Sequence, residues 1–332
     1  MNASKVDELD YIHFLVAAQR VFTTTEAARI RAGELNAPAH DAYTRLLKRI
    51  PPDTEALWQE VAPFVRPDRG VLVVDDTTLD KPHARKMAWV TRHWSGKHKR
   101  VVQGINLISL LWTEGQARLP CDFRLYNRAE DGLTKNDHFR ALLQTAHARG
   151  FQPRLVVFDS WYASLANLKY VRQLGWEWFT RLKANRLVSV EGERRNRPVS
   201  SWPIPAEGCV MHLKGYGWVK VFKTVTPDGR EEYRATSRLD MTLEETAAYG
   251  RHAWQIEVYH QGLKQFTGIE RGQFRVAEAQ RNHIGLAIRA FLRLEVARLQ
   301  RGISWFEAKQ AILREAIRHY LASPSLILHS TA

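Results

Sequence analysis

The sequence predicts an α/β protein in which helical regions at both ends flank a core of strands and helices. Three observations lead to this expectation. The first 66 residues have helical periodicity, short β-branched runs begin after Gly70, and helices alternate with strands from about residue 136. With 332 residues, 45% of them hydrophobic, the chain is long enough to bury one large core or a few small ones.

The N-terminal region, residues 1–66, is predicted to be wholly helical, with runs at about 7–20, 24–31 and 39–50. The second run begins after Thr23, with Glu26 placed as a capping-box acid. The third run gathers basic side chains on one side of a short helix, at Arg45, Lys48 and Arg49. This pattern suits a helix-turn-helix DNA-binding domain, and a helical bundle that packs on the next domain is an equal alternative.

Residues 67–184 are predicted to form the first part of the catalytic core. The run VLVVDD opens it, and two further strands at 86–94 and 101–112 are separated by a basic turn that contains Lys97, Lys99 and Arg100. A helix, a buried strand, a helix and a strand follow, at 136–149, 154–158, 165–174 and 176–180. Three antiparallel strands followed by this alternation is the order expected of an RNase H-like core.

Residues 185–240 interrupt the alternation and predict a β-rich insertion with a hairpin at Asp228-Gly229. Basic side chains in and beside it, Lys183 among them, are interleaved with aromatic ones such as Trp218. Such a mixture suits a surface that follows a DNA backbone and stacks on bases. The alternative is that the aromatic residues are sheet core and the cations a solvated rim.

The last two regions are predicted to be helical. A helix at about 243–265 returns the chain to the core, within residues 241–275, and helices at about 277–300 and 304–321 form the C-terminal region, residues 276–332.

Charge predicts a polyanionic partner. The chain has 49 Lys and Arg residues against 35 Asp and Glu, a net charge of +14. Such a surplus speeds association with nucleic acid and makes the affinity sensitive to salt. A basic protein of unrelated function is the alternative. Two cysteines offer neither metal spacing nor a disulfide framework, and no signal peptide or membrane span is visible, so we expect a cytoplasmic protein with no membrane contact.

Three acidic residues are the candidate catalytic and metal-binding groups. Asp76 and Asp159 each follow an apolar, strand-like run, and Glu257 lies in the late helical segment. Strand ends of an α/β sheet leave side chains free to converge, and hard Mg²⁺ prefers carboxylates with phosphate oxygens. Asp75 is the alternative to Asp76, because neighbours on a strand face opposite sides. Lys264 follows Glu257 by two helical turns on the same side, where it can meet a phosphate.

These motifs resemble those of DDE transposases of bacterial insertion sequences, of the insertion-sequence-4 type or the related insertion-sequence-701 type. The resemblance covers roughly residues 70–275. It consists of an acid that follows a buried strand and precedes Thr-Thr, a second acid that follows another buried strand, a β-rich insertion, and a helix with a glutamate and a lysine. That family also carries a tyrosine and an arginine seven and four residues before the glutamate, where this chain has Gly250 and Ala253. Arg251 lies nearby, at a different helical angle.

The resemblance implies cut-and-paste transposition. Two Mg²⁺ ions, replaceable by Mn²⁺, would be held by Asp76, Asp159 and Glu257 and would activate water and then the freed 3′ hydroxyl. It also implies DNA contacts by Lys264 and Arg251, double-stranded DNA partners in the terminal inverted repeats and the target, a homodimer, and a bacterial cytoplasm with nucleoid association. Two alternatives stay open: a metal-dependent DNA nuclease without strand transfer, and a sequence-specific DNA-binding protein whose acids no longer bind metal.

Overall fold

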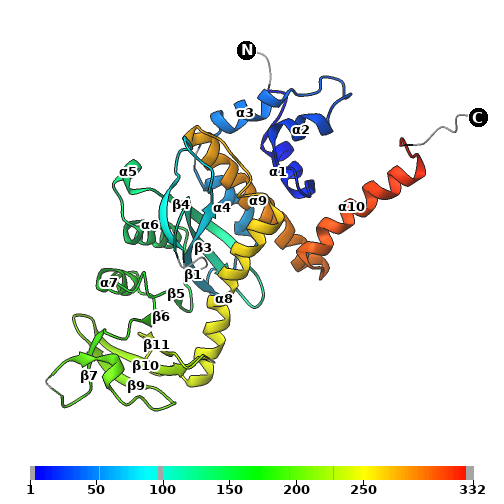
Figure 1. The fold of residues 1–332 in the computed structure, drawn as a ribbon. Coiled ribbons are helices and arrows are strands. Elements are labelled where there is room, and N and C mark those ends of the chain that lie inside the picture. Colours follow the sequence, from blue (N-terminus) through cyan, green and yellow to red (C-terminus); the bar gives the residue numbers. More distant parts are fainter. Residues whose placement is uncertain (1–3, 52, 96–99, 194, 227, 327–332) are drawn as a thin grey trace, which may run out of the picture. The chain divides into compact units, whose positions relative to one another are not determined.

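The computed structural model describes residues 4–51, 53–95, 100–193, 195–226 and 228–326. Its chain, traced in Figure 1, divides into two compact units. The helical unit comprises Met1–Asp53, Arg85–Ala88 and Gln261–Ala332, and the sheet unit comprises Thr54–Ala84 and Trp89–His260. The N-terminal region predicted over residues 1–66 is therefore shared between the two units, and so is the long helix α8, Leu243–Phe266.

Among its described residues, the helical unit contains the end of α8 together with α1 (Glu8–Ala17), α2 (Thr24–Ile30), α3 (His40–Arg49), α9 (Ala277–Arg301) and α10 (Trp305–Ala322). Asn282 of α9 donates hydrogen bonds to the carbonyls of Leu47 and Ile50, at 2.8 and 2.9 Å, and so satisfies the last turn of α3. Gly262 of α8 lies against Phe291 and Trp305, where a Cβ would come within 2.7 Å of both rings. Only glycine allows this close packing.

Lys309 of α10 is buried inside the helical unit, with 4% of its surface exposed. Its Nζ donates to the carbonyl oxygens of Ala18 and Phe266, at 2.5 and 2.7 Å. These residues stand at the ends of α1 and α8, where a positive charge is favoured by the helix dipoles. Burial nevertheless lowers the pKa of Lys309 to about 8.

This pKa predicts an unusual alkaline dependence of stability. Between about 8 and the ordinary lysine value of 10.5, the unfolded chain binds more protons than the folded chain, so the free energy of unfolding rises with pH. We expect a rise on the order of 1 kcal/mol between about pH 8 and pH 10, measured by urea denaturation. Lys309→Met should remove this rise, and Lys48→Met, at an exposed lysine of α3, should retain it. Equal slopes in all three proteins would contradict the prediction.

The sheet unit contains the strands that the structure describes, together with the first part of α8. Its strands are β1 (Val71–Asp80), β2 (Thr91–Ser95), β3 (Arg100–Thr113), β4 (Leu119–Tyr126), β5 (Val156–Phe158), β6 (Trp178–Leu182), β7 (Leu187–Ser189), β8 (Arg197–Pro198), β9 (Cys209–Leu213), β10 (Gly217–Val225) and β11 (Glu231–Thr236). Its other helices are α4 (Glu55–Val61), the 3₁₀ turns Ala62–Phe64 and Val199–Ser201, α5 (Arg128–Asp131), α6 (Lys135–Ala148) and α7 (Leu165–Gln173).

These strands form one mixed sheet in the order β2-β3-β1-β5-β6-β11-β10-β9-β7-β8, with β4 paired to β3. β1 runs antiparallel to β3 and parallel to β5, and β5 runs parallel to β6. The predicted α/β class is confirmed. Strands from the predicted insertion continue the core sheet, because β11 pairs with β6. β4 was not predicted, since its sequence LPCDFRLY interrupts the apolar pattern with Pro120 and Asp122.

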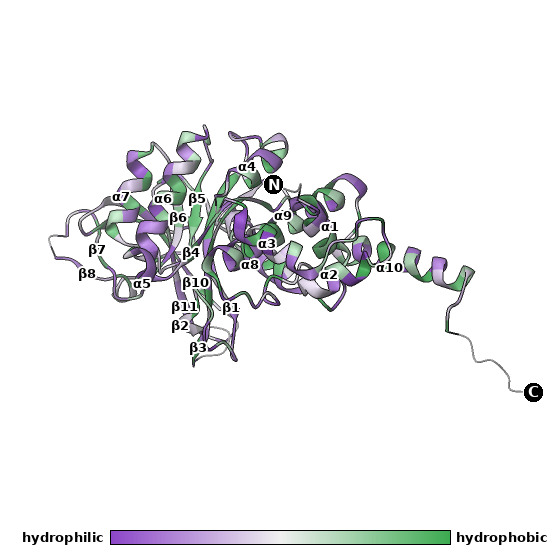
Figure 2. Cartoon of the chain, turned by 90° about the horizontal axis from the view of Figure 1, so that it is seen from above, coloured by the Kyte–Doolittle hydropathy of each residue, from purple (hydrophilic) through white to green (hydrophobic). Residues whose placement is uncertain are grey.

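The centre of the sheet is apolar and is covered on both faces by helices. Val71–Val74 of β1 and the three residues of β5 are all buried. α6 packs on one face through Phe139, Leu142 and Leu143, and Figure 2 shows α6 and α7 carrying both hydrophobic and hydrophilic residues. α8 lies on the opposite face, where Ile256 and Tyr259 are buried. None of the described helices is long and apolar enough to cross a membrane.

Candidate active site

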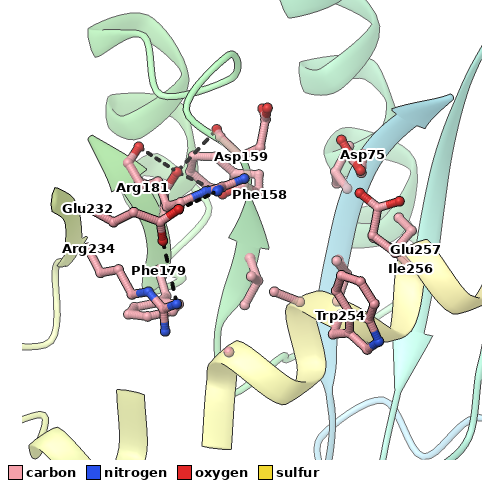
Figure 3. Close-up of a pocket in the computed structure, with 16 residues that line it drawn as sticks. Asp75, Phe158, Asp159, Phe179, Arg181, Glu232, Arg234, Trp254, Ile256 and Glu257 are labelled. Atoms are coloured by element: carbon pink, nitrogen blue, oxygen red, sulfur yellow. Dashed lines mark hydrogen bonds and ion pairs between the residues drawn. The ribbon is translucent and has the colours of Figure 1, made fainter. Parts of the chain in front are cut away.

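Three carboxylates line one pocket on the α8 face of the sheet. Asp75 of β1, Asp159 at the end of β5 and Glu257 of α8 all line it. The register of β1 and β5 ends with Val74 opposite Phe158, so Asp75 and Asp159 follow side by side. Figure 3 shows Asp75 and Glu257 turned toward each other, with Asp159 on the neighbouring strand. The fold thus joins acids that are about 80 and 100 residues apart in the chain.

Asp75 is subject to both burial and the charges of three neighbouring carboxylates. Burial raises the pKa of Asp75 well above its ordinary value, and the charges of Asp76, Asp159 and Glu257 raise it further. Carboxylate or imidazole atoms of Asp75, Glu257 and His260 lie within 4.8 Å of one another. Oxygen and imidazole donors at this separation fit one divalent cation, whose charge would offset the repulsion between the acids. His260 stands one helical turn after Glu257 on the same side of α8, a spacing that could have been noticed in the sequence.

Asp76 points to the other face of the sheet. Its Oδ2 accepts hydrogen bonds from Lys135 Nζ at 2.7 Å and Asn106 Nδ2 at 2.6 Å, and its Oδ1 accepts one from the Tyr162 hydroxyl at 2.9 Å. Burial works against ionisation, but the charge of Lys135 and these hydrogen bonds lower the pKa of Asp76. Asp76 is therefore paired with a cation on that face. The structure places Asp75, the alternative, in the pocket where Asp76 was predicted.

Asp159 is fixed by the turn that follows β5. Its Oδ1 accepts a hydrogen bond from the backbone N–H of Trp161 at 2.9 Å, an Asx-turn geometry. Thr180 of β6 donates to the carbonyl oxygens of Phe158 and Asp159, at 2.7 and 3.2 Å, and ties the end of β5 to its neighbour. Burial raises the pKa of Asp159, so this carboxylate too would gain from a nearby cation.

The rest of the pocket wall comes from α8 and from two sheet strands. α8 contributes Gly250, Ala253 and Trp254, the last with 64% of its surface exposed. β6 and β11 contribute two arginines and a glutamate, Arg181, Arg234 and Glu232. In the transposase family that the sequence resembles, a tyrosine and an arginine occupy the positions of Gly250 and Ala253. In this chain the arginines that line the pocket come from β6 and β11 instead. The spacing of residues along a single helix could not have revealed them.

None of the predicted DNA-binding residues that the structure describes is among the residues lining this pocket. Arg45, Lys48 and Arg49 are on α3 in the helical unit, where Arg45 pairs with Asp41 and Arg49 donates to the carbonyl of Val6 at 3.0 Å. The others are placed as follows: Lys264 on α8 in the helical unit, 3.4 Å from Glu270; Arg251 exposed on α8; Arg100 exposed at the start of β3; Lys183 exposed, 5.9 Å from the Trp161 ring centre; and Lys97 and Lys99 outside the described residues.

Comparison with known proteins defines the class of this fold. The structure is similar to the piggyBac transposase synaptic complex with hairpin DNA, at 12% sequence identity and a TM-score of 0.52, over 98% of this chain and 76% of that one. The Drosophila P element transposase strand transfer complex is similar over 59% of this chain and 48% of that one, at 11% identity and a TM-score of 0.31. The first likeness shows a transposase fold of the RNase H-like type.

Sequence families then give the assignment. The family described as "DDE superfamily endonuclease" matches residues 14–204, and the family described as "Archaeal putative transposase ISC1217" matches residues 130–303. The chain belongs to the DDE superfamily of endonucleases. No curated protein matches the sequence. The predicted DDE class is confirmed. The catalytic roles of Asp159, of Glu257 and of Asp76, with Asp75 as its alternative, stay predictions.

Proposed function

We propose that this protein is the transposase of an insertion sequence, of the insertion-sequence-4 or insertion-sequence-701 type, that moves its element by a cut-and-paste route. The observation that carries the proposal is that Asp75 of β1, Asp159 after β5 and Glu257 of α8 line one pocket, where the parallel pairing of β1 with β5 ends. The family assignment supports an endonuclease, and the net charge of +14 supports a DNA substrate.

The donor set supports a divalent-metal site. Asp75, Glu257 and His260 would hold one ion, and Asp159 would share a second ion with Asp75, because the two carboxylates follow side by side on neighbouring strands. We propose Mg²⁺, with Mn²⁺ as a substitute. Bound ions would lower the pKa of an attacking water or 3′ hydroxyl and stabilise the leaving oxygen.

The chain's own residues have separate parts in this chemistry. Asp75 is held on β1, and Asp159 directly follows the neighbouring β5, where the turn after that strand fixes its carboxylate through the backbone N–H of Trp161. Glu257 comes from α8, whose buried Ile256 and Tyr259 fix the rotation of the helix about its axis. Lys135 pairs with the charge of Asp76 on the far face, and Tyr162 and Asn106 donate hydrogen bonds to it, which keeps that charge from adding fully to that of Asp75.

We propose that the partners are the terminal inverted repeats and the target DNA, and that two copies of the chain act together. Joining two ends of one element requires that two active sites be held at once. Exposed apolar side chains along α10 support a contact between copies, at Phe306, Ile312, Ile317 and Leu321.

The test is cleavage of linear duplexes that carry the DNA flanking the open reading frame. Purified protein is incubated with Mg²⁺ or with EDTA, and the products are resolved on a denaturing gel. We expect Mg²⁺-dependent nicks at one boundary of the flanking sequence and joined products with a target duplex. Nicks without joining would favour the nuclease alternative. Tight binding without cleavage in Mg²⁺ or Mn²⁺ would contradict the enzyme proposal and favour a DNA-binding protein.

A further inference from the structure

Two arginines stand directly opposite each other at the edge of the active-site pocket. Arg181 of β6 and Arg234 of β11 are partners in the antiparallel register, and both line the pocket. Like charges in this position destabilise a strand pair unless an anion lies between them. Glu232 precedes Arg234 by two residues and therefore lies on the same face of β11. In Figure 3 both guanidinium groups turn toward this carboxylate.

Glu232 neutralises the pair only in part. Arg181 Nη1 donates to Glu232 Oε1 at 3.2 Å, whereas Arg234 Nη2 stands 3.7 Å from Oε2, too far for a good hydrogen bond. Within this cluster, a single carboxylate is shared by two guanidinium groups. The side chain of Arg181 is 52% exposed and that of Arg234 is 29% exposed, so an anion from solvent can reach both.

The position of the pair favours a ligand that also reaches the acids. The charge of Arg181 acts on the pKa of Asp159, lowering it against the effect of burial, so the two groups lie within electrostatic reach. On the α8 side, a Cβ at Gly250 would stand 3.0 Å from Arg234 Nη1, so the missing side chain leaves room for the guanidinium against the helix. The planar donor fork of arginine matches the oxygens of a phosphate group.

We propose that Arg181 and Arg234 bind a backbone phosphate of the DNA strand next to the catalytic acids, and that Glu232 occupies this phosphate site in the absence of DNA. The inference rests on the proposed function, because the DNA is the ligand. The two arginines and the glutamate of this ion-pair cluster therefore have opposite effects on DNA binding. The arginines contribute to DNA affinity, and the glutamate competes with DNA.

The test is equilibrium binding of the duplex used for cleavage, in EDTA so that no strand is cut, over a range of salt concentrations. Arg181→Gln and Arg234→Gln should each weaken binding by roughly tenfold and lower the slope of log affinity against log salt by about one. Glu232→Gln should tighten binding several-fold. Arg234→Lys should restore part of the affinity, because it keeps the charge but loses the donor fork.

Matched controls come from the turn between β10 and β11. Arg230 donates to Asp228 at 2.6 Å, outside the pocket, so Arg230→Gln and Asp228→Asn make the same charge changes elsewhere. We expect their effects to be much smaller. Weaker binding by Glu232→Gln, or a gain equal to that of Asp228→Asn, would overturn the phosphate site. A wild-type protein that binds and cuts DNA while the arginine variants bind normally would overturn this inference alone. A wild-type protein that neither binds nor cuts would overturn the proposed function as well.

Discussion

Replacement of Asp75 or Asp159 by asparagine is expected to abolish metal-dependent cleavage while DNA binding is retained. Each change removes an anionic donor from the proposed metal site, and loss of about 4 kcal/mol of transition-state stabilisation corresponds to roughly a 10³-fold slower reaction. Nicking assays with Mg²⁺ and binding assays in EDTA measure the two effects separately. Glu257→Gln should behave in the same way.

Replacement of Asp75 is also expected to change the stability of the protein. Because burial and three neighbouring carboxylates raise the pKa of Asp75, its charge opposes folding in the absence of metal. Asp75→Asn should therefore raise the Tm in EDTA while it removes activity. The control is Asp76→Asn, which should cleave DNA at temperatures where it is folded. An inactive but folded Asp76→Asn protein beside an active Asp75→Asn protein would return the catalytic role to Asp76.

Disruption of the Asp76–Lys135 pair is expected to give the largest loss of stability. The two side chains are 18% and 16% exposed and lie 2.7 Å apart, so either charge alone would be left poorly solvated. We expect Asp76→Asn and Lys135→Met each to lower the free energy of unfolding by roughly 2–4 kcal/mol, somewhat less than for a fully buried pair. Differential scanning calorimetry and urea denaturation measure this loss.

The double variant Asp76→Asn/Lys135→Met provides the decisive comparison. With both charges gone, its loss should be clearly smaller than the sum of the single losses. Additive losses would show that the two charges do not act as a pair. The pKa of Asp76 is lowered in the folded state, so its contribution is present above the ordinary value of 3.8 and is lost as the pH falls through the lower folded value. The wild type should therefore lose more stability under acid than the double variant.

Much of the architecture follows from local patterns. Helical periodicity predicted α6, α7, α8, α9 and α10 to within a few residues. The first four of these helices bury apolar side chains, whereas those of α10 are largely exposed. The strand starting at Val71 was found because four consecutive apolar residues of β1 are buried on both faces. Element boundaries were predicted less accurately in segments where the hydrophobic pattern is weak. The strand predicted at 86–94 is only Thr91–Ser95, since Arg85–Ala88 belongs to the helical unit.

The sequence alone predicted a DDE-type protein with three candidate acids and an excess of cations, because acidic residues after strand-like runs and net charge are visible in the order of residues. Tertiary structure decided which of two adjacent aspartates enters the pocket: the register of β1 with β5 turns Asp75 toward α8 and Asp76 toward Lys135. It also brought Arg181 and Arg234 together across two strands, 53 residues apart. Such pairings depend on strand register and helix placement, which arise from packing between distant segments and leave no trace in local spacing.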